Sequence, residues 1–137
     1  MTKMPARERQ GESEKITINL GYVDLGRIDL LVSEGFYSNR TDLIRAAIRG
    51  ELASHAEALR RSAAHHSLEM GLRDYGLGEL EKARNDGRAL HINVVGLVRI
   101  ARDVPPELAR AAIGSIRVLG ALEASPEVRA ALADRMK

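Results

Sequence analysis

Polar and apolar side chains alternate strictly over residues 15–20, which read Lys-Ile-Thr-Ile-Asn-Leu. A period of two predicts a β-strand with one apolar and one polar face. The apolar face carries Ile16, Ile18 and Leu20, and the polar face carries Lys15, Thr17 and Asn19. Nothing else in residues 1–70 has a strand pattern, and so short a strand needs a partner edge. We therefore expect it to pair with the same strand of a second copy, as an antiparallel ribbon whose polar face fits a DNA major groove.

Two helical patterns follow this strand. Apolar residues recur at helical spacing up to Gly35, a residue typical of a helix C-terminus. A second helix is predicted to begin at Ser38 or Asn39, where a polar side chain can cap it. The apolar positions of the first helix are Leu25, Ile28, Leu31 and Val32, and those of the second are Leu43, Ile44, Ala47, Ile48 and Leu52.

With this order of elements, residues 15–52 resemble the ribbon-helix-helix transcription factors of the MetJ/Arc/CopG type. The resemblance lies in Lys-Ile-Thr-Ile-Asn-Leu and in Gly-Phe-Tyr-Ser-Asn-Arg-Thr-Asp-Leu-Ile-Arg-Ala-Ala-Ile-Arg at 35–49. It implies a homodimer that binds double-stranded operator DNA, with base contacts from Lys15, Thr17 and Asn19. The free amides at the start of the second helix favour a phosphate beside Ser38, Asn39 and Arg40. The implied dimer core is Ile16, Ile18, Leu20, Ile28, Ile44 and Ile48.

The net charge gives this interpretation no support. The chain has 21 basic and 19 acidic side chains. Residues 1–52 contain eight of each. A positive field would therefore have to be local, from the N-terminal arm (Lys3, Arg7, Arg9), Lys15, and Arg40, Arg45 and Arg49 of the second helix.

The pattern predicts an α+β protein with two folded parts. Residues 1–14 have the composition of a flexible arm. Residues 15–70 form the ribbon-helix-helix module with a long second helix, and the glycines near 71–78 predict a linker. Residues 79–137 are expected to be a β-α-β-α repeat, because Ile92 to Val98 aligns without a gap with Ile116 to Leu122 and a proline-led helix start follows each copy. Two such strands leave open edges, which favours pairing between subunits.

No catalytic site, metal site or cofactor is expected. The chain has no cysteine, which excludes thiolate metal sites and cysteine nucleophiles. A nickel-sensing branch of the resembling family makes His65, Glu69, His66 and His91 worth testing as ligands, but the chain lacks that branch's cysteine ligand and any His-x-His pair. A solvated helix face explains these residues better.

Two functions remain from different classes. The first is a DNA-binding transcriptional repressor, a homodimer at minimum, whose C-terminal half joins dimers into a tetramer or senses an effector. The second is the antitoxin of a toxin pair, which binds a protein toxin and represses its own promoter. Antitoxin tails of this family tend to be short and disordered before they bind, whereas residues 77–137 carry strand patterns and helix starts, which favours the repressor. No apolar run is long enough to span a bilayer, so we expect a cytoplasmic protein without a membrane partner.

Overall fold

The computed structural model describes residues 13–137. The chain divides into two compact units, with the boundary between Leu59 and Arg60. Both helices and strands are present, in agreement with an α+β protein. Most of the arm predicted at residues 1–14, with Lys3, Arg7 and Arg9, lies outside the described residues.

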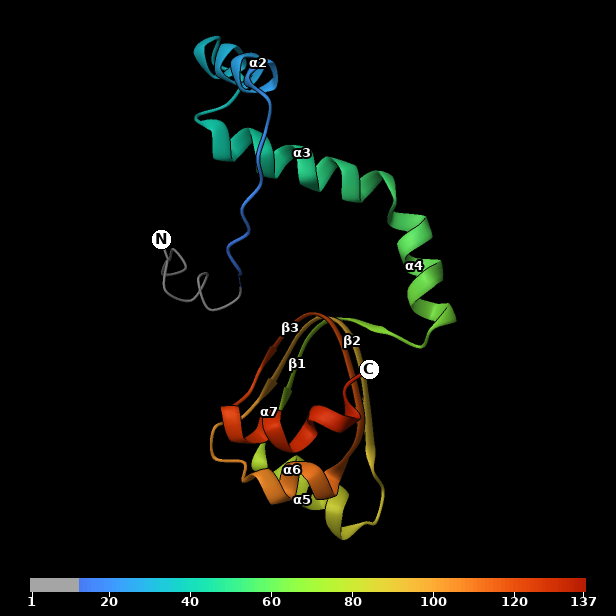
Figure 1. Cartoon of the computed structure of the whole chain (residues 1–137). Helices are drawn as coiled ribbons and strands as arrows, with labels where there is room; N and C mark the ends of the chain where they lie inside the picture. Colours follow the sequence, from blue (N-terminus) through green and yellow to red (C-terminus); the bar gives the residue numbers. More distant parts are fainter. Residues whose placement is uncertain (1–12) are drawn as a thin grey trace, which may run out of the picture. The chain divides into compact units, whose positions relative to one another are not determined.

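In the first unit, the segment predicted as a ribbon has no secondary structure in the single chain, and two helices follow it (Figure 1). The first helix, α2, spans Tyr22–Ser33. Its C-terminus is closed by Gly35, whose φ of 88° is in the left-handed region. The Gly35 N–H donates to the Val32 carbonyl and the Phe36 N–H to the Leu31 carbonyl, both at 3.0 Å. These two bonds form the motif that ends helices at glycine, which confirms the predicted stop.

The second helix, α3, spans Arg40–Ser54 and begins where the sequence predicts. Of the two expected cap residues, Asn39 is the cap, because its side-chain oxygen accepts the Asp42 N–H at 2.8 Å. Asparagine is among the residues best suited to satisfy the free amides of a first helical turn.

The long second helix expected up to Met70 is interrupted at His55. The Ser54 hydroxyl donates to the Glu51 carbonyl at 2.6 Å, at the acceptor that the His55 N–H would use in a continuous helix. The His55 N–H instead donates to the Leu52 carbonyl at 3.1 Å. A hydroxyl that competes with the backbone in this way bends or breaks a helix. A separate helix, α4, then spans Ala56–His65.

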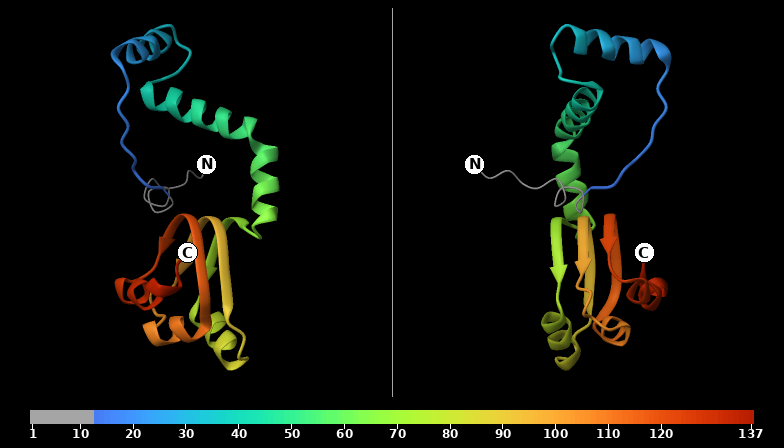
Figure 2. Two further views of the ribbon diagram at one scale, coloured as in Figure 1. Left: turned by 45° about the vertical axis from the view of Figure 1, so that its right-hand side comes forward. Right: turned by 90° about the vertical axis from the view of Figure 1, so that its left-hand side faces the viewer.

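The second unit contains three parallel strands, each followed by a helix. The order along the chain is β1 (Glu69–Tyr75), α5 (Leu77–Asn85), β2 (Leu90–Ile100), α6 (Pro106–Ala112), β3 (Ile113–Glu123) and α7 (Pro126–Leu132). A 3₁₀ turn, η1, spans Ala133–Arg135. The sheet order is β1-β2-β3, so neighbours in sequence are neighbours in space, as the side view in Figure 2 shows.

Strand β1 departs from the expected domain organisation, since it occupies most of the segment predicted as a linker at 71–78. Its sequence, Glu-Met-Gly-Leu-Arg-Asp-Tyr, has no β-branched residue, and only Tyr75 is buried. A strand with so few buried side chains has no period-two signal. The C-terminal unit therefore holds three strands where the sequence predicts two.

The pairing of β2 with β3 joins the residues that the sequence alignment placed together. Ile92 is opposite Ile116, and the register continues without a shift to Val98 opposite Leu122. The helices after these strands begin at Pro106 and Pro126, as predicted. The same register aligns three glycines across the sheet, Gly71, Gly96 and Gly120.

Each of the aligned glycines has a positive φ, between 128° and 141°. The long strands β2 and β3, which contain Gly96 and Gly120, are arched (Figure 1). A Cβ at Gly96 would stand 2.1 Å from the Gly71 carbonyl oxygen, and one at Gly120 would stand 2.0 Å from the Gly96 carbonyl oxygen. Only glycine allows both this backbone conformation and this close approach.

The core of the described chain lies in the second unit. This core forms where the inward residues of the strands pack against the three helices. Its members are Tyr75, Leu80, Ala83, Ile92, Val94, Val98, Ile100, Val104, Leu108, Ala109, Ala112, Ile113, Ile116, Val128 and Leu132.

Candidate nucleic-acid interface

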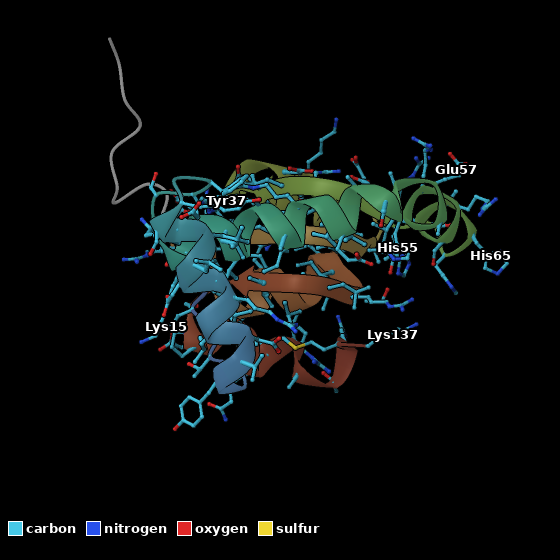
Figure 3. All side chains as sticks on the ribbon, turned by 90° about the horizontal axis from the view of Figure 1, so that it is seen from above. Lys15, Tyr37, His55, Glu57, His65 and Lys137 are labelled. Carbon is cyan, nitrogen blue, oxygen red and sulfur yellow. The ribbon has the colours of Figure 1, made fainter. Side chains whose placement is uncertain are left out.

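The three polar residues of the predicted ribbon, Lys15, Thr17 and Asn19, are exposed and precede α2. Figure 3 labels Lys15 in this segment. None of the three has a hydrogen bond or ion pair with another part of the described chain. Their side chains are therefore free to contact a ligand, although a lone chain does not form the strand that would align them.

The apolar residues that alternate with them are exposed as well. Ile16 is 73% exposed and Ile18 is 59% exposed. Of the other residues predicted for a dimer core, Leu20 and Ile48 are exposed, whereas Ile28 and Ile44 are half-buried. Neither α2 nor α3 contains a buried residue.

The described residues of the first unit therefore have no core of their own. Within the described chain, no residue before Ala63 is buried. A module with so little buried apolar surface cannot offset the conformational entropy of ordering its chain. Its exposed isoleucines and leucines form an apolar surface that the described residues of this unit leave uncovered.

At the start of α3, the structure places the three predicted phosphate-binding residues next to one another but gives them different tasks. Ser38 is exposed without a partner in the described chain, and Asn39 caps the helix. The Arg40 guanidinium forms a two-pronged ion pair with Asp29 of α2, with Nε to Oδ1 and Nη2 to Oδ2 both at 2.8 Å. Arg40 therefore links the two helices and keeps three of its five N–H donors, two on Nη1 and one on Nη2, for another acceptor.

The ion pair shifts the pKa of both of its partners. The hydrogen bond from Arg40 lowers the pKa of the Asp29 carboxyl, and the same bond raises the pKa of Arg40. Both groups stay charged at neutral pH. The two side chains are about half exposed, so solvent weakens the attraction between them.

Asp29 is the residue that sequence reasoning missed. It stands eleven positions before Arg40, in the preceding helix. No helical or strand periodicity links positions that far apart, and only the complementary charges beside the turn signal the pair.

Two further arginines of α3 remain available. Arg45 and Arg49 are exposed, lie four residues apart in one helix and have no ion pair within residues 13–137. Residues at this spacing share a helix face. They supply the local positive charge that the neutral composition of residues 1–52 does not.

The histidines are not gathered into a metal-binding group in residues 13–137. Among residues 13–137, no three His, Asp or Glu side chains are grouped closely enough to hold a metal ion. The rings of His65 and His66 stand edge to face, with centroids 4.9 Å apart. His91 lies in β2, where its Nδ1 is 2.8 Å from the Ser115 hydroxyl.

No helix in the described part of the chain is long and apolar enough to cross a bilayer.

Comparison with known proteins identifies the family. Searches of curated proteins and of solved structures found no significant match. The profile of the ribbon-helix-helix transcriptional regulator family matches residues 11–129, which include the ribbon segment, both helices and nearly all of the three-stranded unit. The resemblance inferred from residues 15–52 is confirmed, and the chain belongs to the ribbon-helix-helix transcriptional regulator family.

Proposed function

We propose that this protein is a transcriptional repressor that reads the major groove of its operator with a ribbon made by residues 15–20 of two chains. The observation that carries the proposal is the absence of a core among the described residues of the first unit, where Ile16 and Ile18 are exposed. Pairing the two segments antiparallel satisfies their backbone groups and turns the isoleucines toward the helices.

The polar face of the ribbon then supplies the base contacts. Lys15 donates to guanine O6 and N7, Asn19 pairs with adenine through its amide, and Thr17 contacts a thymine methyl group or a base acceptor. These three side chains have no competing partner in the described chain, so no contact within the chain has to break first.

The start of α3 is the proposed phosphate contact. The side chain of Asn39 satisfies the Asp42 N–H, which leaves the Arg40 and Thr41 amides for a phosphate beside Ser38. Arg40 contributes the N–H groups that the ion pair leaves free and holds the helix start against α2 through Asp29. The carboxylate of Asp42 weakens this site somewhat.

The C-terminal unit is proposed to join two such dimers into a tetramer on neighbouring half-sites. Its parallel sheet has two edges, and an unpaired edge favours association. We also propose that its three strand-helix pairs are three copies of one structural repeat, each with one of the aligned glycines in its strand. A tail that folds only around a toxin would not be expected to carry a core of its own, so the buried residues of this unit support the repressor over the antitoxin.

The test begins with selection of bound duplexes from a random DNA pool by the full chain, followed by affinity measurements on the enriched sequence. Asn19→Ala is expected to cost about 1–3 kcal/mol on that sequence and to relax the preference at particular base pairs. Arg40→Ala should weaken all DNA about equally and reduce the salt dependence.

Asp29→Asn is the matched control for Arg40, because it breaks the ion pair and keeps the guanidinium. If Asp29→Asn reproduces the loss seen with Arg40→Ala, then Arg40 acts by holding the helices and not by binding phosphate. The proposal fails if no sequence is enriched, or if Asn19→Ala keeps the full sequence preference.

A further inference from the structure

The two edges of the parallel sheet differ in whether other residues cover them. At the β3 edge, Met136 forms a bridge with Ile116, and the Lys137 N–H donates to the Ile116 carbonyl at 2.9 Å. The Arg135 guanidinium donates to the carbonyls of Arg110 and Ile113 beside them. The C-terminal residues therefore cap part of the β3 edge.

The opposite edge has no such cap. Within the described chain, β2 is the only strand next to β1, so the outward N–H and C=O groups of β1 have no ladder partner. Repeated strand-helix proteins usually close their ends with a polar cap, because an open end associates with other chains.

The row of aligned glycines, Gly71, Gly96 and Gly120, ends with open space at the β1 edge. At Gly96 and Gly120, a carbonyl oxygen of the preceding strand occupies the place where a Cβ would stand. Gly71 has the same left-handed φ, 128°, but nothing lies within 4 Å of that place. Inside the sheet, a carbonyl oxygen of the neighbouring strand lies against Gly96 and another lies against Gly120. At the β1 edge, the equivalent space beside Gly71 is empty.

The exposed side chains of β1 are apolar and continue a stripe across the sheet. Met70 is 53% exposed and Leu72 is 41% exposed. The register aligns these two residues with Val95 and Leu97 of β2, and then with Leu119 and Ala121 of β3. The apolar stripe therefore runs up to the uncapped edge.

The sequence of β1 is complementary to itself about Gly71. In an antiparallel pair of β1 strands centred on this glycine, Met70 lies opposite Leu72 of the second copy and Glu69 lies opposite Arg73. Apolar and opposite-charge pairs directly across two strands stabilise a sheet. In the single chain, Arg73 already donates to Glu69 at 2.7 Å, so a second copy brings together two compatible ion pairs and no like charges.

We propose that β1 pairs with β1 of a second copy across a two-fold axis at Gly71, which doubles the three-stranded sheet. A two-fold contact closes on itself, whereas a head-to-tail contact would need the capped β3 edge and would continue into a filament. This pairing rests on the proposed function only in that it supplies the contact between two ribbon dimers.

Disulfide cross-linking tests the pairing in the full chain, which has no cysteine of its own. A tagged chain with Met70→Cys is co-expressed with an untagged chain with Leu72→Cys and oxidised with copper phenanthroline. We expect a cross-linked species of mixed mass. The matched control replaces Leu72→Cys by Leu119→Cys, which has similar exposure at the opposite edge and should not cross-link to position 70.

A second measurement determines the mass of the native particle by light scattering. The variant Met70→Asp/Leu72→Asp should halve the particle mass, because four facing carboxylates repel and the apolar contact is lost, whereas Leu119→Asp should leave the mass unchanged. Thermal unfolding of each variant checks that the C-terminal unit remains folded.

The outcomes separate this inference from the proposed function. Cross-links between positions 70 and 119, or none between 70 and 72 in a folded chain, would overturn the β1 pairing even if the operator is still bound. Cross-links that persist in a chain that binds no specific DNA would refute the repressor and keep the pairing. Cross-linked chains in a particle of two subunits would keep the pairing and refute the tetramer.

Discussion

Ile18 offers the sharpest test of the dimer, because its side chain has a large area to bury and stands between the proposed base contacts. Replacing it by alanine removes three carbon groups, each contributing about 0.8 kcal/mol when fully buried. Since 59% of the residue is exposed in the single chain, burial of these three groups in the dimer contributes up to about 1.4 kcal/mol per copy. Two copies give about 2.8 kcal/mol, which corresponds to a dimer dissociation constant raised roughly 100-fold.

The dissociation constant is best measured by sedimentation equilibrium in the Met70→Asp/Leu72→Asp background, in which the ribbon is the one proposed contact between chains. Thr17→Ala serves as the control, because Thr17 is the neighbouring residue on the polar face of the ribbon. Its dimer should be as stable as the parent, although its operator affinity should fall. Equal dimer dissociation constants for Ile18→Ala and Thr17→Ala, or a folded monomeric parent at micromolar concentration, would refute the reasoning.

Deletion of residues 69–137 should leave a dimer that binds one half-site and loses about 10²-fold in apparent affinity on two half-sites spaced about 10 bp apart or a multiple, measured by gel shift against the full chain. Gly96→Ala should destabilise the C-terminal unit by at least ~1–3 kcal/mol in urea unfolding, because its Cβ meets the Gly71 carbonyl at a positive φ, whereas Gly78→Ala in α5 has open space and should cost nothing. The hydrogen bond from Arg40 lowers the pKa of Asp29, so the ion pair stabilises the fold above the ordinary carboxyl pKa of 3.8 and loses its effect as pH falls through the lowered value. Unfolding of Asp29→Asn followed from pH 6 down to about pH 2 should therefore show a smaller loss of stability than wild type, and parallel curves would contradict this role.

Local signals in the sequence predicted helix α2, the turn after it and the start of helix α3. Gly35 and Asn39 act through the backbone of their own turns, so the end of α2 and the start of α3 are readable without the fold. The pattern over residues 15–20 predicts a strand for the same reason, but the single chain has no secondary structure there, and the ribbon stays a prediction. In the second unit, the matching Ile-x-Val-x-Gly runs were enough to align β2 with β3.

Only the tertiary structure decided the features that depend on partners far apart in sequence. Strand β1 carries one buried residue, so its place in the sheet is determined by β2 and not by its own pattern. The break at His55 depends on which donor reaches the Glu51 carbonyl, and the Arg40–Asp29 pair depends on how α2 and α3 pack. The three aligned glycines are separate residues in the sequence. The structure shows why two of them must be glycine, because a carbonyl oxygen of one strand occupies the space where a Cβ of the next would stand. Contacts of this kind join positions that no local periodicity relates, and for that reason the sequence alone could not predict them.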